Sequence, residues 1–359
     1  MSARGDRGSA GSSARLLGLG PDRIAGLDIP GRRRPTRRYS LLALTHNRTI
    51  LAHRHDRPPG NTPATPGSAP VSARDGYSHG LRIGCVGFLN AKPLIHGLQT
   101  ALPGAELHLD APSALLDGLE DRRFDLALCP VIDAQRAATP LRLVPAGGIG
   151  CDGATLTVRL FADRPFDQVR TVVADPDSHT SVALLRCLWR ARYGVDPRLV
   201  QPAAGAKPLD PLGTGAHAAL LIGDKVVPEL ERLPEAQQLD LGDAWKRHTG
   251  RPFVFATWMA RQDTQLGDAP ARLAGLLDRN LAGLDTLIDR YSAEHGWPTD
   301  LARQYVGEYL RYRVGPAELD AIAAFYAACA DAGVIDRVHD IPVDPVDTPA
   351  PQGEGASTA

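Results

Sequence analysis

The sequence predicts an α/β protein with two lobes and a ligand cleft between them. Short apolar strands alternate with helical stretches from about residue 81, and the same alternation begins again near residue 171. Two long β-rich segments, 155–161 and 252–258, stand on either side of the second unit, where a chain would cross between lobes. A second lobe inserted into the first, with two β crossings, explains this order, and such a fold binds its ligand between the lobes.

The first unit has the order strand, helix, strand, helix, strand. Its elements are a buried strand over 81–88, a helix over 91–102, an alternating strand over 106–111, a helix over 114–119 and a strand over 125–130. Ser113 precedes the second helix, and we expect it to act as the N-cap. Because strands that alternate with helices pair in parallel, the unit predicts a parallel sheet with helices on both faces.

The second unit repeats this alternation, and a helical region follows it. The predicted elements of the second unit are a strand over 171–175, a helix over 179–192 and a strand over 218–223. From about residue 270, five leucines recur on one face of a helical pattern: Leu273, Leu276, Leu277, Leu281 and Leu284. We therefore place the first lobe at residues 81–158 and 252–341, and the second lobe at residues 159–251.

The two ends of the chain differ from this body in composition. Residues 1–80 hold 13 Arg, no Lys and 5 Asp, so they carry +8, whereas the other 279 residues carry 27 basic and 36 acidic side chains, which is −9. Arg, Gly, Ser and Pro dominate the first 80 residues without a helical or strand period, so we expect a disordered basic leader. The Pro-rich, acidic residues 342–359 predict a disordered tail.

A second hypothesis for the leader is a misassigned translation start. Met1 and Met259 are the only Met residues of the chain. A start just before the body would therefore use a codon other than Met, for instance at Val71.

Composition also excludes several classes of protein. Nucleic-acid-binding domains concentrate Lys and Arg on the folded surface, which the acidic body does not do. No apolar run approaches the roughly 20 residues of a membrane helix, so we expect no membrane segment. The five cysteines form no C-x-x-C pair: Cys85, Cys129, Cys151, Cys187 and Cys329. Their scatter argues against a disulfide framework and a structural zinc site, so we expect a cytoplasmic protein without a metal.

Two segments follow strands at the edge where parallel sheets bind ligands. Asn90 opens the first helix, where an N-cap role explains it, although a capping Asn can also present its amide to a ligand. Ser178, Thr180 and Ser181 supply more hydroxyls at a helix start than a cap needs, which favours an anionic ligand such as a carboxylate or phosphate. His179 has no evident carboxylate or serine partner, so we predict no nucleophilic triad.

A Gly-rich segment and an acidic turn are weaker candidates. Residues 147–153 lack the spacing of a nucleotide-binding loop, and their glycines favour close approach of the backbone to a ligand. Cys151 in this segment has no basic neighbour that would activate it, and we interpret it as a buried, inert thiol. Asp224 follows a buried strand, where a turn and a cleft carboxylate both fit.

Six segments between residues 81 and 262 form an ordered set of motifs. They are Arg82-Ile83-Gly84 with Phe88-Leu89-Asn90-Ala91-Lys92-Pro93-Leu94, Gly150-Cys151-Asp152-Gly153 with Thr157, Ser178-His179-Thr180-Ser181, Leu221-Ile222-Gly223-Asp224, Asp240-Leu241-Gly242-Asp243-Ala244-Trp245, and Thr249-Gly250-Arg251-Pro252-Phe253-Val254-Phe255. In order and spacing, the set resembles the chorismate dehydratases of the futalosine route to menaquinone.

The resemblance implies both a fold and a reaction. The fold is that of the type II periplasmic binding proteins, which agrees with the two lobes predicted above. The reaction is the dehydration of chorismate to 3-[(1-carboxyvinyl)oxy]benzoate by a hydro-lyase that uses neither a metal nor an organic cofactor. In the mechanism proposed for the family, the enolpyruvyl carboxylate of the substrate takes the proton. That explains why the motifs contain no obvious His or Glu general base.

The resemblance also assigns residues to the site. The active-site Asn of the family falls on Asn90, and its active-site hydroxyl residue, a Ser in relatives, falls on Thr157, which adds a methyl group and a stiffer χ1. Implied substrate contacts fall on six positions: Lys92, Cys151, Gly153, Ser178, Thr180 and Ser181. Residues 129–133 depart from the commoner hydroxyl-and-Glu version, so no role is carried onto them. An acidic body repels a dicarboxylate substrate at long range, so the groups that attract the substrate must lie close to it. The candidates for these groups are Lys92, the Gly-rich backbone and the helix start at Ser178.

Two alternatives share the predicted fold. One is a non-catalytic protein that binds a small anion and delivers it to a transporter. A receptor of that kind usually needs a signal peptide or a lipid anchor, and neither is visible in the sequence. The other is the sibling enzyme, 1,4-dihydroxy-6-naphthoate synthase, whose motif after the first strand differs from residues 89–94.

Overall fold

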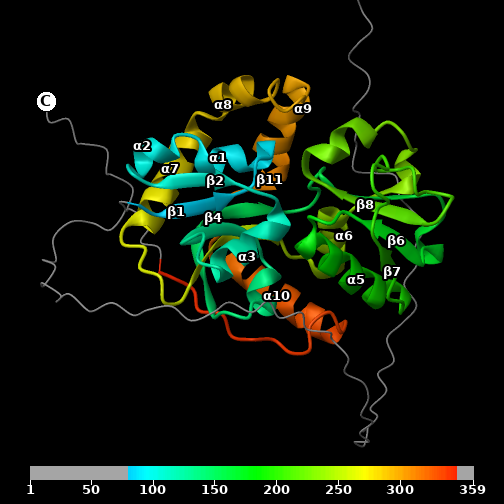
Figure 1. Ribbon diagram of the computed structural model, residues 1–359. Coiled ribbons are helices and arrows are strands. Elements are labelled where there is room, and N and C mark those ends of the chain that lie inside the picture. Colours follow the sequence, from blue (N-terminus) through cyan, green and yellow to red (C-terminus); the bar gives the residue numbers. More distant parts are fainter. Residues whose placement is uncertain (1–79, 346–359) are drawn as a thin grey trace, which may run out of the picture. The chain divides into compact units, whose positions relative to one another are not determined.

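The computed structural model describes residues 80–345 (Figure 1). The predicted leader, apart from Gly80, and most of the predicted tail lie outside these residues. Within them, the strands form one sheet of six strands and one of five, as the predicted two-lobe α/β fold requires. In the same range, no helix has both the length and the apolar character needed to cross a bilayer.

The sheet of the first lobe is mixed. Its strand order is β11-β4-β10-β3-β1-β2. The strands are β1 (Arg82–Cys85), β2 (Glu106–Leu109), β3 (Leu126–Pro130), β4 (Leu141–Cys151), β10 (Phe253–Arg261) and β11 (Leu310–Arg311). The parallel pairing predicted for the first three strands is confirmed, since β1 lies between β2 and β3 in parallel register. β10 is antiparallel to both β3 and β4 because the chain returns to this sheet from the second lobe.

Short helices connect the first strands. They are η1 (Leu89–Ala91), α1 (Lys92–Ile95), α2 (Leu98–Ala101), η2 (Pro112–Ala114), α3 (Leu115–Glu120) and α4 (Asp133–Arg136). The single helix expected over 91–102 is divided at Gly97, whose φ of +78° is a left-handed conformation that suits glycine. The N-cap prediction for Ser113 is wrong, because Ser113 lies inside η2 and makes no capping bond. Its hydroxyl instead donates to Asp177 Oδ1 of the second lobe at 3.2 Å.

The second sheet has the order β7-β6-β8-β5-β9. Its strands are β5 (Val158–Ala162), β6 (Thr171–Ala174), β7 (Arg198–Val200), β8 (Ala218–Ile222) and β9 (Gln238–Asp240). The helices of this region are η3 (Phe166–Gln168), α5 (His179–Tyr193), η4 (Gly223–Glu229), η5 (Glu235–Gln237) and α6 (Leu241–Thr249). The strands predicted near 171 and 218 and the helix between them are confirmed.

The chain passes between the two sheets twice. Residues 152–157 lead from β4 to β5, and α6 precedes the return into β10. Strands β4 and β10 pair closely because glycines line β4. A Cβ on Gly148 would lie 2.6 Å from the carbonyl oxygen of Ala256, and a Cβ on Gly150 would lie 2.6 Å from that of Phe253. The glycines of this segment therefore admit a neighbouring strand, whereas the sequence suggested that they admit a ligand.

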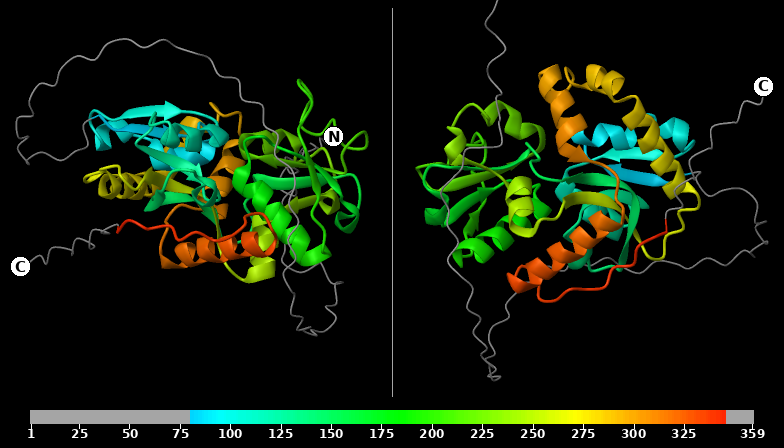
Figure 2. Two further views of the ribbon diagram at one scale, coloured as in Figure 1. Left: turned by 60° about the horizontal axis from the view of Figure 1, so that its bottom comes forward. Right: turned by 180° about the vertical axis from the view of Figure 1, so that it is seen from behind.

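Helices return the chain to the first lobe. They are α7 (Ala269–Ala282), α8 (Leu284–Tyr291), α9 (Thr299–Gln304), the π-helical turn η6 (Tyr305–Tyr309) and α10 (Pro316–Asp331). The predicted leucine face is confirmed: Leu273, Leu276 and Leu277 are buried, and the other two leucines pack against the same core. Helix α10 runs past the first sheet to α5, and it contacts both β10 and α5 (Figure 2).

The first residues of the predicted tail lie beside β4. The Leu143 amide donates to the carbonyl of Pro342 at 2.8 Å, and the Asp344 amide donates to the carbonyl of Leu143 at 2.8 Å. The Arg142 guanidinium also pairs with the Asp344 carboxylate at 2.8 Å. Residues 342–344 are thus held against the edge of the first lobe.

The close approach of β4 and β10 predicts a large effect of Gly148→Ala. The new methyl group would press on the carbonyl of Ala256, and we expect a loss of about 1–3 kcal/mol in the free energy of unfolding. Gly215→Ala is the matched control, because a Cβ there meets nothing within 4 Å. Denaturant unfolding of both variants measures the difference, and equal stabilities would contradict the packing described.

Candidate active site

A cavity lies between the two sheets and is lined by both. Five of the residues selected from the sequence line it: Asn90, Thr157, Ser178, Thr180 and Ser181. Its apolar walls come from β1, β3, β4, β8 and β10 and the residues beside them: Val86, Phe88, Pro112, Leu128, Pro130, Ile149, Val158, Ile222, Phe255 and Ala256. Polar groups are therefore concentrated at a few points of a mainly apolar cavity, as in sites that orient a small molecule.

Asn90 presents its amide to the cavity and does not cap a helix. It lies inside η1, it is 9% exposed, and its side chain makes no capping bond. Asn90 Nδ2 donates to the hydroxyl of Tyr305 at 3.1 Å. Asn90 Oδ1 is buried without a hydrogen-bond partner among the described residues. Because an unpaired buried acceptor is costly, this oxygen is a candidate to receive a hydrogen bond from a ligand.

Thr157 is held in place by the backbone of the first crossing. The Asp240 carboxylate accepts from the Thr155 amide at 3.0 Å and from the Leu156 amide at 2.7 Å. It also caps α6. Leu156 has φ +64°, a left-handed conformation that costs a non-glycine residue about 1 kcal/mol. The Thr157 carbonyl accepts from the Gly223 amide at 2.9 Å, so Thr157 is fixed from both sides.

Tyr305 joins Asn90 to Thr157. It begins the π-helical turn η6, it is completely buried, and its ring stacks on that of Trp297 with centroids 4.7 Å apart. Its hydroxyl lies 2.6 Å from Thr157 Oγ1 and 3.1 Å from Asn90 Nδ2. Burial raises the pKa of Tyr305, so the phenol keeps its proton. No local sequence pattern pointed to this residue, which lies in a region where the family resemblance is weak.

The groups involved decide one of these two hydrogen bonds. Asn90 Nδ2 can only donate, so the oxygen of Tyr305 accepts from it. Either hydroxyl can donate between Tyr305 and Thr157. In the arrangement in which the Tyr305 O–H donates, Thr157 keeps its own proton for another acceptor, and Asn90 Oδ1 stays free to accept. The cavity is thus offered one hydroxyl donor and one amide acceptor from neighbouring residues.

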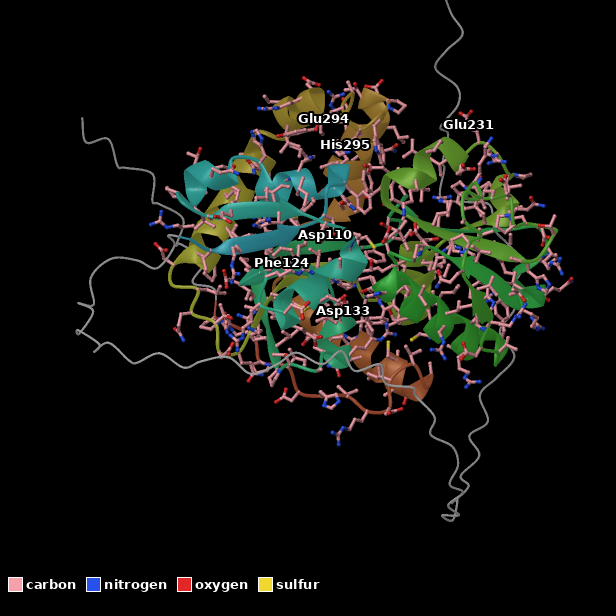
Figure 3. All side chains as sticks on the ribbon, in the orientation of Figure 1. Asp110, Phe124, Asp133, Glu231, Glu294 and His295 are labelled. Carbon is pink, nitrogen blue, oxygen red and sulfur yellow. The ribbon has the colours of Figure 1, made fainter. Side chains whose placement is uncertain are left out.

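Asp224 holds the surroundings of this group together. Its carboxylate accepts from Trp297 Nε1 at 3.1 Å and from the Leu89 amide at 3.4 Å, and it lies 2.9 Å from His295 Nδ1. It does not line the cavity, although Gly223 beside it does. Asp224 therefore connects the second lobe to η1 and to the turn between α8 and α9, where Figure 3 labels His295.

The start of α5 forms the other polar part of the cavity. Ser178 is 3% exposed, and its hydroxyl has no hydrogen-bond partner among the described residues. Thr180 Oγ1 accepts from the Ile132 amide at 3.4 Å. Free hydroxyl and amide groups at the N-terminus of a 15-residue helix favour an anion, as the sequence predicted.

His179 has a carboxylate partner that the sequence did not reveal. Its Nδ1 lies 2.8 Å from Oδ1 of Asp133, which is on α4 of the first lobe and is labelled in Figure 3. The expectation that His179 stands without a carboxylate is therefore wrong. The two residues are 46 positions apart, and residues 129–133 depart from the family motif, so no sequence pattern pairs them.

Three residues selected from the sequence are not among those that line the cavity. Lys92 is buried with its ammonium 4.9 Å from the centre of the Tyr291 ring. Cys151 is buried at the end of β4, and burial raises the pKa of its thiol, which agrees with an inert cysteine. Gly153 lies in the first crossing with φ +129°. None of the three gives the cavity a polar group.

The fold and the cavity define a class of two-lobe α/β proteins. Among solved structures, the chain is similar to a protein from Archaeoglobus fulgidus, with a TM-score of 0.56, 15% identity, and coverage of 72% of this chain and 100% of the other. It is also similar to the periplasmic aliphatic sulphonate binding protein of Escherichia coli, with a TM-score of 0.52, 16% identity, and coverage of 73% and 96%. A Candida albicans gene product described as having the generic periplasmic binding protein fold has a TM-score of 0.55, 11% identity, and coverage of 75% and 97%. These likenesses show the periplasmic-binding-protein fold.

Sequence comparison then gives the family. The profile described as "Menaquinone biosynthesis" matches residues 81–331, and the chain belongs to this family. A chorismate dehydratase from Thermus thermophilus is 28% identical over 227 residues, which cover 59% of this chain and 80% of the relative.

The role of Asp240 predicts that Asp240→Asn destabilises the protein. An amide in place of the carboxylate puts an N–H₂ group where backbone amides of residues 155, 156, 242 and 243 need acceptors. We expect a loss of about 1–3 kcal/mol in the free energy of unfolding. Asp152→Asn, which removes an exposed pair with Lys246, is the control and should cost less than about 1 kcal/mol. A similar loss in both variants would contradict the role given to Asp240.

Proposed function

We propose that the protein is a chorismate dehydratase that converts chorismate to 3-[(1-carboxyvinyl)oxy]benzoate and water in menaquinone biosynthesis. The observation that carries the proposal is the group formed by Asn90, Tyr305 and Thr157, which offers a hydroxyl donor and an amide acceptor to an apolar cavity. Membership of the menaquinone biosynthesis family and the chorismate dehydratase relative support it.

The reaction removes a proton from C3 and a hydroxyl group from C4 of chorismate. The electrons of the C3–H bond form the new ring double bond while the C4–O bond breaks, so the ring becomes aromatic. The enolpyruvyl carboxylate of the substrate takes the proton, as the family resemblance implies. The carboxylate then returns this proton to the departing oxygen, which leaves as water, so the proton and the hydroxyl group lost from the ring together make the one water released. Aromatisation drives the reaction, so the protein chiefly has to orient the substrate and stabilise the leaving oxygen.

Asn90 and Thr157 are suited to hold the leaving hydroxyl group. Asn90 Oδ1 accepts the hydrogen of that group, and Thr157 donates its own proton to the oxygen. Negative charge grows on this oxygen as the C–O bond breaks, so the Thr157 hydrogen bond is stronger in the transition state than in the ground state. Tyr305, which also lines the cavity, contacts both groups through its hydroxyl.

The start of α5 is suited to hold a substrate carboxylate. Ser178 offers an unpaired hydroxyl, and Thr180 and Ser181 line the cavity beside it. A helix N-terminus adds a favourable dipole for an anion. With the leaving hydroxyl held at Asn90 and Thr157, contacts at two places would fix the orientation of the ring.

A cytosolic location without a cofactor is part of this proposal. It rests on the scattered cysteines, which are free and buried at all five positions of the described chain. It also rests on the reaction, because dehydration with aromatisation transfers no electrons to an acceptor.

Incubation of the full-length protein with chorismate tests the proposal. We expect loss of the diene absorbance of chorismate and a product lighter by the mass of one water. A folded sample that binds small anions but leaves chorismate unchanged would favour a non-catalytic binding protein of the same fold.

Asn90→Ala should nearly abolish turnover and leave the fold intact. The variant loses the acceptor for the leaving hydroxyl and the donor to Tyr305, and we expect kcat to fall by at least about 100-fold. Steady-state kinetics and a thermal melt measure the two effects. A loss of stability with only a small fall in rate would give Asn90 a structural role.

Substitutions at Thr157 separate the hydroxyl group from the methyl group. Thr157→Val keeps the shape but removes the donor, and we expect a fall in kcat of roughly 100- to 1,000-fold. Thr157→Ser keeps the donor, so its rate should stay within about tenfold of the original protein. Equal rates for the two variants would show that the hydroxyl of Thr157 does not act in the reaction.

A further inference from the structure

The cavity contains one side chain that can carry a positive charge. Among the described residues that line it, the ionisable ones are Asp177, His179 and Tyr305, and neither a lysine nor an arginine is present. Lys92, which the sequence offered as a local cation, lies over the ring of Tyr291 and does not reach the lining. An anionic ligand in this cavity can therefore meet a cation only at His179.

The structure fixes the imidazole of His179 from the first lobe. Its Nδ1 lies 2.8 Å from Asp133 Oδ1, and the side chain of Asp133 is 1% exposed. The second oxygen of that carboxylate is buried without a partner among the described residues. A carboxylate on one ring nitrogen leaves the other nitrogen to donate to a ligand, and it stabilises the charged form of the ring.

Other charged groups near His179 are paired or make no hydrogen bond to it among the described residues. The carboxylate of Asp177, its neighbour along the chain, accepts from Lys225 Nζ at 2.9 Å. Arg136 on α4 and Asp117 on α3 act on His179 only through longer-range charge interactions of opposite sign. Among the causes of the pKa shift of His179, the hydrogen bond to Asp133 is the largest.

We propose that His179, held by Asp133, supplies the positive charge that binds one carboxylate of the substrate beside the unpaired hydroxyl of Ser178. The proposal rests on the proposed function, because that function defines the ligand as a dicarboxylate. His179 acts here as a binding residue, and Asp133 acts through it as a positioning residue.

The pairing makes ligand binding depend on pH. The hydrogen bond and charge of Asp133 raise the pKa of His179 above its usual value near 6.5, and burial opposes the rise. The imidazolium is present below this raised pKa and is lost as the pH rises through it. Affinity for a dicarboxylate should therefore be high at mildly acidic pH and fall at alkaline pH.

Calorimetric titration with the reaction product, 3-[(1-carboxyvinyl)oxy]benzoate, from about pH 5.5 to about pH 9 tests the proposal. For the original protein, we expect affinity to fall roughly 10- to 100-fold across this range, as for loss of a hydrogen bond to a charged group. His179→Gln should bind weakly at every pH. Asp133→Asn should bind at low pH, with the fall in affinity moved to lower pH, which a merely structural residue would not cause.

His108→Gln is the matched control, because His108 lies on β2 with a side chain 46% exposed and is not among the residues that line the cavity. It should keep the pH profile of the original protein. The proposal is overturned if the original protein binds the product equally well at all pH values, or if its profile survives in His179→Gln. Conversion of chorismate, measured on the same samples, tests the proposed function separately, so either can fail while the other stands.

Discussion

The hydroxyl group of Tyr305 is the point at which the candidate active site is assembled. It joins Asn90, which follows the first strand, to Thr157, which lies on the first crossing between the lobes. Asn90 lies in a short 3₁₀ helix, and the backbone around Thr157 is held by contacts of Asp240 and Gly223, so Tyr305 adds the side-chain contact that joins the two. Trp297 and Asp224 hold Tyr305 in turn, so both lobes and the C-terminal helices contribute to one small group of atoms.

This arrangement explains how a largely apolar cavity can support a reaction without redox chemistry. When the Tyr305 hydroxyl donates to Thr157, one donor and one acceptor of the group remain for the substrate. In a mainly apolar cavity such groups interact more strongly with a developing charge than they would in bulk water. The charge of the cavity lining also affects the binding of an anionic substrate, because the body of the protein is acidic. Among the lining residues of the described chain, only His179 can become a cation.

The sequence predicted the fold well and the site in part. Strand and helix periods located β1, β3, β6, α5 and β8, because these elements are encoded by local apolar patterns. The family resemblance located Asn90 and Thr157, which the structure brings together. Tyr305 lies 215 positions from Asn90, and Asp133 lies 46 positions from His179, so no local pattern could pair them. Lys92 does not line the cavity, and its ammonium lies over the ring of Tyr291. The charge of a residue in the sequence does not show where its side chain points.

The kinetics of Tyr305→Phe test the central claim most directly, with Tyr312→Phe as the control. Both hydroxyls are buried, but that of Tyr312 has no partner among the described residues and its side chain does not line the cavity. If Tyr305 orients Asn90 and Thr157, its loss should lower kcat for chorismate roughly 10- to 100-fold with little change in KM, and Tyr312→Phe should leave both unchanged. Equal kcat values for the two folded variants would contradict the account.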